Sequence, residues 1–331
     1  MSQISGFAKR AACTTAIALC VFPQIAAAAK ITTFDAPGAA EGTYAIAVSK
    51  AGVAGYYFDG NGTAHSFVRT SSGTIASFDP PGAQSSSAAG INAHGAITGG
   101  YEDGNGGHGY VRAADGTFTT FDVAGSPGTS GVAINARGAI AGGYDDGNFE
   151  PHGFVRSPDG TITTFDPPGS QNTAVTCISA HGTIAGDYSD GTTIHGFVRT
   201  PDGTITTFDV PGSGATYAFG IDAKGAITGP YIDGSGEHGY VRAANGTFTT
   251  FDGPGSTDTS PNAINNKGAI AGYYADSGGN GHGFVRAPNG KITTFDAPGS
   301  EGTAAFGISG ARITGYYNDG TTVHGFLRKG H

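Results

Sequence analysis

The chain has 331 residues, of which 59 are glycine and 16 are proline. These two residues most strongly oppose regular helix, so the composition excludes a helical bundle. The formal charge is −9 at pH 7, and an acidic chain without a basic run is a poor ligand for nucleic acid.

The first 29 residues have the pattern of a Sec signal peptide. Lys9 and Arg10 precede an apolar run over residues 11–22, and alanines over 26–29 provide the small residues that signal peptidase requires. The run is too short to span a bilayer, so we expect export to the periplasm or the medium, with no membrane span. Cleavage would leave Cys177 as the single cysteine, with 15 basic and 26 acidic side chains, so no internal disulfide is expected.

Residues 30–331 contain seven repeats of about 43 residues each. One marker is a Phe followed by Asp, at Phe34, Phe78, Phe121, Phe165, Phe208, Phe251 and Phe295. A second marker is a His followed by a small residue, an aromatic, an aliphatic and Arg, at His65, His108, His152, His195, His238, His282 and His324. Such a fixed period indicates a solenoid or a propeller.

Each repeat predicts four short strands. In the repeat over 172–209, apolar stretches at 173–178, 183–188, 195–200 and 204–209 are separated by turns rich in Gly, Asp and Pro. Four antiparallel strands in about 43 residues are typical of one propeller blade.

The two ends of the mature chain are complementary. Residues 31–35 repeat the fourth-strand sequence, and the last full strand, at 324–328, is a third strand. Pairing between them would complete the last blade and leave no free sheet edge. We therefore predict an all-β fold with one domain over 30–331, a seven-bladed β-propeller of four antiparallel strands per blade. A β-solenoid is the alternative, although no polar capping repeat is visible.

The repeats also suggest a family. Gly90, Ile91 and Asn92, then Gly95 and Gly99, are followed by a His, Gly, Tyr triplet at 108–110. This pattern resembles the bacterial extracellular repeat family named HAF for its His, Ala, Phe signature. Gly or Ser replaces Ala in every copy here. The resemblance implies an exported β-repeat protein and no established activity.

Acidic residues recur in step with the histidines. An Asp follows each marker Phe, and a second Asp precedes each His, at Asp59, Asp103, Asp146, Asp190, Asp233, Asp276 and Asp319. A residue needed once for catalysis need not occur in every blade, whereas one that builds each blade must. We therefore interpret the His, Asp and Arg as a structural network, in which Asp209 and Asp190 bracket His195 if the register allows.

Metal and covalent chemistry have little support in the sequence. Histidines on separate blades would be spread around a ring rather than converge on one zinc ion. Loops such as 59–62 offer oxygen ligands for calcium but lack a full calcium-binding loop pattern, so calcium remains open and no other cofactor is expected. Cys177 lies within a predicted strand and no Ser lies in a nucleophile elbow, so no catalytic residue is assigned.

Ligand specificity must lie where the blades differ. The residue before the second-strand Tyr varies most suggestively, as Tyr56, Gly100, Gly143, Asp187, Pro230, Tyr273 and Tyr316. In a closed ring the three tyrosines would form one contiguous arc, which could stack on a sugar ring or simply pack between blades. Tyr56, Tyr273, Tyr316 and Asp187 are the candidate ligand-binding residues.

The sequence favours an exported, monomeric, non-catalytic propeller that binds a glycan or a protein through one face. The main alternative is a polysaccharide lyase or hydrolase that uses Tyr, His or Asp from individual repeats. A structural protein of the cell envelope is a further alternative, which would present uniformly polar faces without a pocket.

Overall fold

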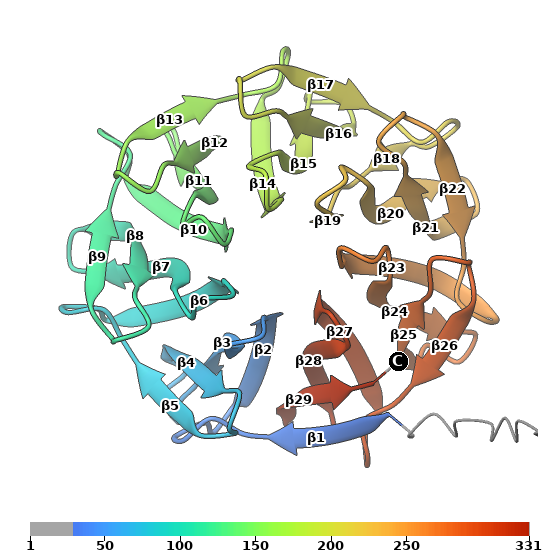
Figure 1. The fold of residues 1–331 in the computed structure, drawn as a ribbon, viewed down its shortest axis with the longest axis horizontal. Helices are drawn as coiled ribbons and strands as arrows, with labels where there is room; N and C mark the ends of the chain where they lie inside the picture. Colours follow the sequence, from blue (N-terminus) through green and yellow to red (C-terminus); the bar gives the residue numbers. More distant parts are fainter. Residues whose placement is uncertain (1–28, 331) are drawn as a thin grey trace, which may run out of the picture.

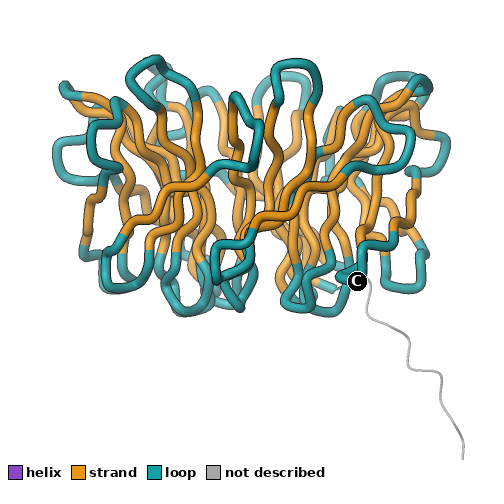
Figure 2. Tube along the Cα trace, turned by 90° about the horizontal axis from the view of Figure 1, so that it is seen from above, coloured by secondary structure: helices purple, strands orange, loops and turns teal. Residues whose placement is uncertain are grey.

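The computed structural model describes residues 29–330, so the predicted signal peptide lies outside the described residues except at Ala29. Strands are the regular elements of this part of the chain, and it holds no helix long and apolar enough to cross a bilayer. The strands form a β-propeller, in which sheets stand side by side around a central channel (Figure 1). Loops cover two opposite faces of the ring (Figure 2).

Each repeat contributes four successive strand positions, counted outward from the channel. The innermost strands are β2 (Gly42–Val48), β6 (Ser85–Ile91), β10 (Gly128–Ile134), β14 (Asn172–Ile178), the pair β18 (Ala215–Thr216) and β19 (Gly220–Ile221), β23 (Ser256–Ile264) and β27 (Gly302–Ser309). The second strands are β3 (Gly52–Phe58), β7 (Ile97–Asp103), β11 (Ile140–Asp145), β15 (Ile184–Ser189), β20 (Ile227–Asp233), β24 (Ile270–Asp276) and β28 (Arg312–Asn318).

The outer half of each repeat has the same regularity. The third strands are β4 (Ala64–Thr70), β8 (Gly106–Arg112), β12 (Pro151–Arg156), β16 (Ile194–Arg199), β21 (Gly236–Arg242), β25 (Gly281–Arg286) and β29 (Val323–Lys329). The outermost strands are β5 (Ile75–Phe78), β9 (Phe118–Phe121), β13 (Ile162–Phe165), β17 (Ile205–Phe208), β22 (Phe248–Phe251), β26 (Ile292–Phe295) and β1 (Lys30–Phe34).

The two ends of the described chain pair with each other. β1 runs antiparallel to β29, with Ile31 opposite Arg328 and Phe34 opposite Gly325. The predicted strand over 31–35 therefore begins and ends one residue earlier. Asp35 lies just beyond the strand, and its carboxylate is 2.8 Å from Nδ1 of His324, the same contact that Asp209 makes with His195 in its own repeat.

The apolar core lies between neighbouring sheets. Ala141 and Val155 of one repeat, for example, pack against Val175, Ile184 and Phe197 of the next. The aromatic residue of each third strand is fully buried, as in Phe197. Each repeat therefore needs a neighbour to cover its apolar face, which makes the ring a cooperative unit.

Two local features shape the channel wall. A Cβ at Gly186 would lie 2.1 Å from the carbonyl oxygen of Ala174, so only glycine allows the second strand to approach the first there. Just beyond this point the innermost strand bulges, as the register skips Thr176 between Val175 and Cys177. A bulge redirects a side chain, and Thr176 accordingly lines the channel.

Candidate functional site

The repeated histidines lie between two carboxylates. In each repeat Nδ1 is 2.8–3.0 Å from the Asp that follows the outermost strand, and Nε2 is 3.1–3.8 Å from the Asp of the loop before the third strand. The second-strand Tyr lies beside the imidazole, with ring centroids 5.1–5.4 Å apart. The predicted bracket of Asp209 and Asp190 around His195 is therefore present, and it recurs throughout the ring.

These contacts set the charges of the network. The pKa of His108 is raised, chiefly by its hydrogen bond to Asp122, against the opposing effect of burial. The pKa of Asp103 is lowered, chiefly by the backbone N–H of Asn105, which donates to its carboxylate. Within residues 29–330 no three His, Cys, Asp or Glu side chains are arranged as metal ligands.

The repeated arginines join neighbouring repeats. Each guanidinium lies over the marker Phe of the preceding repeat, 4.7–5.2 Å from the ring centre. Arg69 makes this contact with Phe34, which stands just before Asp35 at the start of the described chain. The identity of these contacts in every repeat favours a role in assembling the ring rather than in binding a ligand.

The variable second-strand position forms what we call the mouth column, Tyr56, Gly100, Gly143, Asp187, Pro230, Tyr273 and Tyr316. Its members lie opposite an innermost-strand residue of their own repeat, as Gly100 lies opposite Ser87 and Gly143 opposite Ser130. They also face the next repeat, because a Cβ on Gly100 would lie 2.6 Å from Oγ of Ser130. Large side chains in the column therefore fill the gaps between repeats, whereas its glycines leave them open.

The predicted aromatic arc is present and continuous. The Tyr273 ring lies 6.4 Å from Phe306, which stacks on Tyr316 at 4.7 Å. Tyr316 then meets Tyr44 edge-on at 5.0 Å, and Tyr44 stacks on Tyr56 at 5.1 Å. The face-to-face stacks of Phe306 on Tyr316 and of Tyr44 on Tyr56 are within single repeats, while Tyr273–Phe306 and Tyr316–Tyr44 are the contacts between repeats.

Burial in this arc affects the phenol groups. The pKa of Tyr316 is raised to about 12, first by burial and then by neighbouring tyrosines. Burial also raises the pKa values of Tyr56 and Tyr273. These three phenols therefore stay protonated at neutral pH and are poor general bases.

Asp187 occupies the mouth column in another setting. Burial raises the pKa of its carboxyl group to about 7, and Oδ1 is buried without a hydrogen-bond partner. It faces Tyr217 and Ala218 of the next repeat, where the innermost strand is interrupted between β18 and β19. Asp187 therefore changes its charge state close to neutral pH, while it lies apart from the residues that line the pocket described next.

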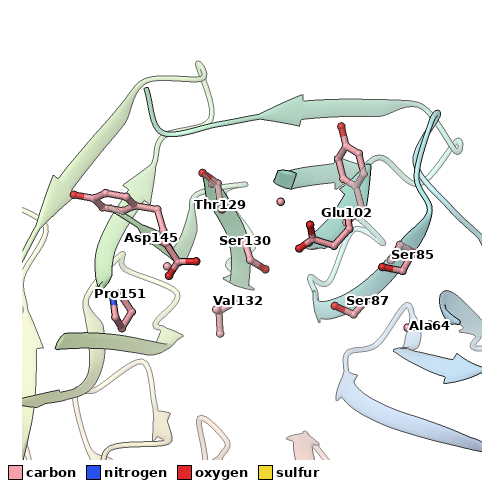
Figure 3. Close-up of a pocket in the computed structure, with 16 residues that line it drawn as sticks. Ala64, Ser85, Ser87, Glu102, Thr129, Ser130, Val132, Asp145 and Pro151 are labelled. Atoms are coloured by element: carbon pink, nitrogen blue, oxygen red, sulfur yellow. The ribbon is translucent and has the colours of Figure 1, made fainter. Parts of the chain in front are cut away.

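The two glycines of the mouth column open a pocket of about 340 Å³ between β7 and β11 (Figure 3). Its wall carries the hydroxyl groups of Ser87 and Ser130 and the carboxylates of Glu102 and Asp145. The two carboxylates lie on either side of Ser130 (Figure 3). Where three other repeats carry tyrosine at this position of the mouth column, these two repeats leave a polar hollow.

The acidic character of the pocket is specific to its two repeats. Glu102 and Asp145 each follow the second-strand Tyr, and the corresponding residues elsewhere are Phe58, Ser189, Ile232, Ala275 and Asn318. No lysine, arginine or histidine is among the residues that line the pocket. The hollow therefore offers hydrogen-bond acceptors and negative charge together.

Sequence reasoning found one half of this site. It identified the column that contains Gly100 and Gly143 but assigned binding to its tyrosines and to Asp187, and it did not single out Glu102, Asp145 or Ser130. The position immediately after each second-strand Tyr carried the missing signal, because only the second and third repeats place an acid there.

No protein-family model matches the sequence, and no curated protein is similar enough to count as a match. Solved structures do share the fold. A streptogramin B lyase superposes with a TM-score of 0.62 at 16% identity, over 91% of this chain and 98% of that one. Virginiamycin B lyase from Staphylococcus aureus gives 0.61 at 15% identity, over 90% and 99% of the two chains.

A third solved structure supports the same conclusion. The propeller domain of the Trilobed protease from Pyrococcus furiosus gives a TM-score of 0.63 at 9% identity, over 88% of this chain and 96% of that domain. At these identities the likeness establishes the β-propeller scaffold, whereas function must be argued from the site.

Proposed function

We propose that the chain is an exported, seven-bladed propeller of the HAF repeat type, whose ring is closed by β1 in the last blade. Support comes from the five residue pairs between β1 and β29, from the His324 contact with Asp35 and from the Arg69 contact with Phe34. Closure would give every sheet two neighbours and remove the exposed outer edge of β29.

We further propose that this propeller is a monomeric binding protein for a glycan, held in the pocket that Gly100 and Gly143 leave open. The pocket carries the proposal because it combines a volume of about 340 Å³ with serine hydroxyls and two carboxylates. Carboxylates accept strong hydrogen bonds from hydroxyl groups, and ligand pockets of about 300–1,000 Å³ are typical of small-molecule sites.

The charge of the pocket selects among glycans. Glu102 and Asp145 have no basic neighbour in the pocket wall, so a uronate or sulfated sugar would meet uncompensated negative charge. Neutral sugars and sugars with a free amine would bind without this repulsion. The aromatic arc contains three members of the same column, Tyr56, Tyr273 and Tyr316. That these tyrosines contact the ligand stays a prediction.

A binding experiment tests this proposal. The purified protein is applied to arrays of neutral, amine-bearing and uronate oligosaccharides, and each ligand found is titrated by calorimetry. Glu102→Gln should weaken binding at least tenfold, because a hydrogen bond to a charged group contributes about 1.5–3 kcal/mol. Glu301→Gln, on another repeat, is the control and should bind normally. The proposal fails if no glycan binds, or if both variants bind equally well. A protein ligand would then be the better hypothesis.

A second candidate function is cleavage of a glycan at Asp187, which would be a site separate from the pocket that Gly100 and Gly143 leave open. Two observations favour it: lyases of the same fold match nearly the whole chain, and Asp187 has a pKa of about 7 with an unpartnered oxygen. A carboxyl group with that pKa can both donate and accept a proton near neutral pH. The test is release of reducing or unsaturated ends from a bound oligosaccharide. Asp187→Asn should abolish release and retain binding, and absence of release by the unmodified protein excludes this function.

A further inference from the structure

The central channel has a volume of about 450 Å³ and walls that are mainly apolar. The innermost strands supply one belt of aliphatic side chains, Val48, Ile91, Ile134, Ile221, Ile264 and Ile308. A second belt comes from the bulged position of each repeat, Ile46, Ala89, Val132, Thr176, Phe219, Asn262 and Phe306. None of the channel-lining residues within 29–330 is charged.

Asn262 and Thr176, two polar side chains of this wall, donate hydrogen bonds to backbone carbonyl groups of the protein. Nδ2 of Asn262 donates to the carbonyl oxygen of Ala305 at 2.8 Å. Oγ1 of Thr176 donates to the carbonyl oxygen of Ala218. The channel therefore presents an apolar surface to any molecule that enters it.

The channel and the polar pocket meet at one residue. Val132 lines both of them, two positions after Ser130 on β10. In Figure 3, Val132 lies beyond Ser130 on the side away from Thr129. The pocket between Glu102 and Asp145 and the channel are thus adjacent, with Val132 in the wall of both.

We propose that the ligand is amphipathic: a sugar that carries an alkyl or acyl chain, with the sugar in the pocket and the chain in the channel. This inference rests on the proposed glycan-binding function and adds the apolar part of the ligand. A polar hollow and an apolar channel that share a wall match the two parts of such a molecule. Burial of each methylene removes apolar surface from water, so chain length should govern affinity.

The first test compares matched glycosides. Methyl and octyl glycosides of glucose and of glucosamine are titrated below the micelle concentration, by calorimetry. The octyl compound should bind at least tenfold more tightly than the methyl compound with the same sugar. Equal affinity of the two would overturn the amphipathic ligand while leaving the sugar-binding proposal intact. Failure of both to bind would count against the amphipathic ligand, while the array experiment decides the glycan function separately.

The second test reads out the channel itself. The neutral probe N-phenyl-1-naphthylamine should become fluorescent with the protein and be displaced by the octyl glycoside. Ala89→Phe introduces the side chain that two other repeats already carry at this position, Phe219 and Phe306. It should remove the fluorescence of the probe and the tighter binding of the octyl glycoside, while preserving binding of the methyl glycoside. Ala124→Phe, at an exposed loop position, is the control. A probe signal unchanged by Ala89→Phe would contradict the proposed channel site.

Discussion

The guanidinium carbon of Arg69 lies 5.2 Å from the centre of the Phe34 ring, so the first repeat rests on a residue from the start of the described chain. An equivalent contact within the ring joins Arg199 to Phe165 at 4.9 Å. Both phenylalanines also meet a buried aromatic ring edge-on at 6.0 Å, Phe67 and Phe197 respectively. The chain end is thus packed in the same way as the interior of the ring.

This equivalence predicts equal costs of substitution. Phe34→Leu and Phe165→Leu should each lower the free energy of unfolding by about 1–2 kcal/mol, because each loses a cation–π contact and part of its packing. Urea unfolding of the two variants measures this. A Phe34→Leu variant as stable as the unmodified protein, beside a destabilised Phe165→Leu variant, would show that β1 adds nothing to the ring.

The His–Asp network predicts a stability that falls from mildly acidic to alkaline pH. The pKa of His108 is raised in the folded protein, so its contribution is complete below about pH 6.5, the ordinary histidine value, and is lost as the pH rises through the raised pKa. The pKa of His238 is raised likewise, chiefly by its hydrogen bond to Asp252. Melting temperatures between pH 5.5 and 8.5 test the sign of this dependence.

A matched pair of variants assigns that pH dependence to the network. Asp122→Asn removes the main partner of His108 and should make the decline in melting temperature shallower, while the other repeats keep their share of it. Asp115→Asn changes a carboxylate whose pKa is lowered chiefly by the backbone N–H of Thr117, and should leave the decline unchanged. Identical profiles for the two variants would exclude the His108–Asp122 pair as a source of the decline.

The buried carboxyl group of Asp187 should lower the stability of the folded protein at alkaline pH. Its pKa of about 7 in the folded protein exceeds the unfolded value of about 3.9, so the folded state binds more protons between these limits and loses stability as the pH rises. Asp187→Asn should therefore stabilise the protein at pH 8, by about 1–4 kcal/mol, and have a much smaller effect at pH 4. Denaturant unfolding at both pH values measures the difference. Destabilisation at pH 8 would contradict a charged, poorly solvated Asp187.

The aromatic arc allows packing and ligand contact to be separated. Tyr316→Ala should cost about 3 kcal/mol, because the ring packs against Phe306 and Tyr44. Tyr316→Phe keeps that packing and should preserve both stability and glycan binding. Calorimetric titration of the Phe variant checks this. Loss of binding at unchanged stability would instead place the Tyr316 hydroxyl against the ligand.

The all-β propeller scaffold could be predicted because its determinants recur in the sequence. The strand period, the turn residues and the fourth-strand sequence at residues 31–35 all indicate one architecture. The limits of the predicted fourth strand, 204–209, were one residue too wide at each end. Asp209 lies outside the strand and contacts His195, and single-sequence patterns do not resolve such a difference.

The candidate site was harder to predict because it arises from missing side chains. Gly100 and Gly143 matter through the space they leave, and the walls of that space come mainly from β6, β7, β10 and β11. Sequence alone indicated that the mouth column varies. It left packing between blades open for the tyrosines, but it could not indicate that Tyr44 and Phe306 would be their partners, or that glycine would expose Glu102 and Asp145.

The pocket between Glu102 and Asp145 can be tested by filling it. A Cβ at Gly143 would lie 3.7 Å from its nearest neighbour, an ordinary contact, and three other repeats carry tyrosine at this position. Gly143→Tyr should therefore fold normally and occupy the pocket. Gly147→Tyr adds the same side chain in open space on the loop of the same repeat and serves as the control.

Calorimetric titration of these two variants with the glycan selected by the unmodified protein is the most direct measurement. The account predicts that Gly143→Tyr melts at the same temperature as the control and shows no heat of binding, while Gly147→Tyr binds with unaltered affinity. Unaltered affinity in a folded Gly143→Tyr variant would contradict it.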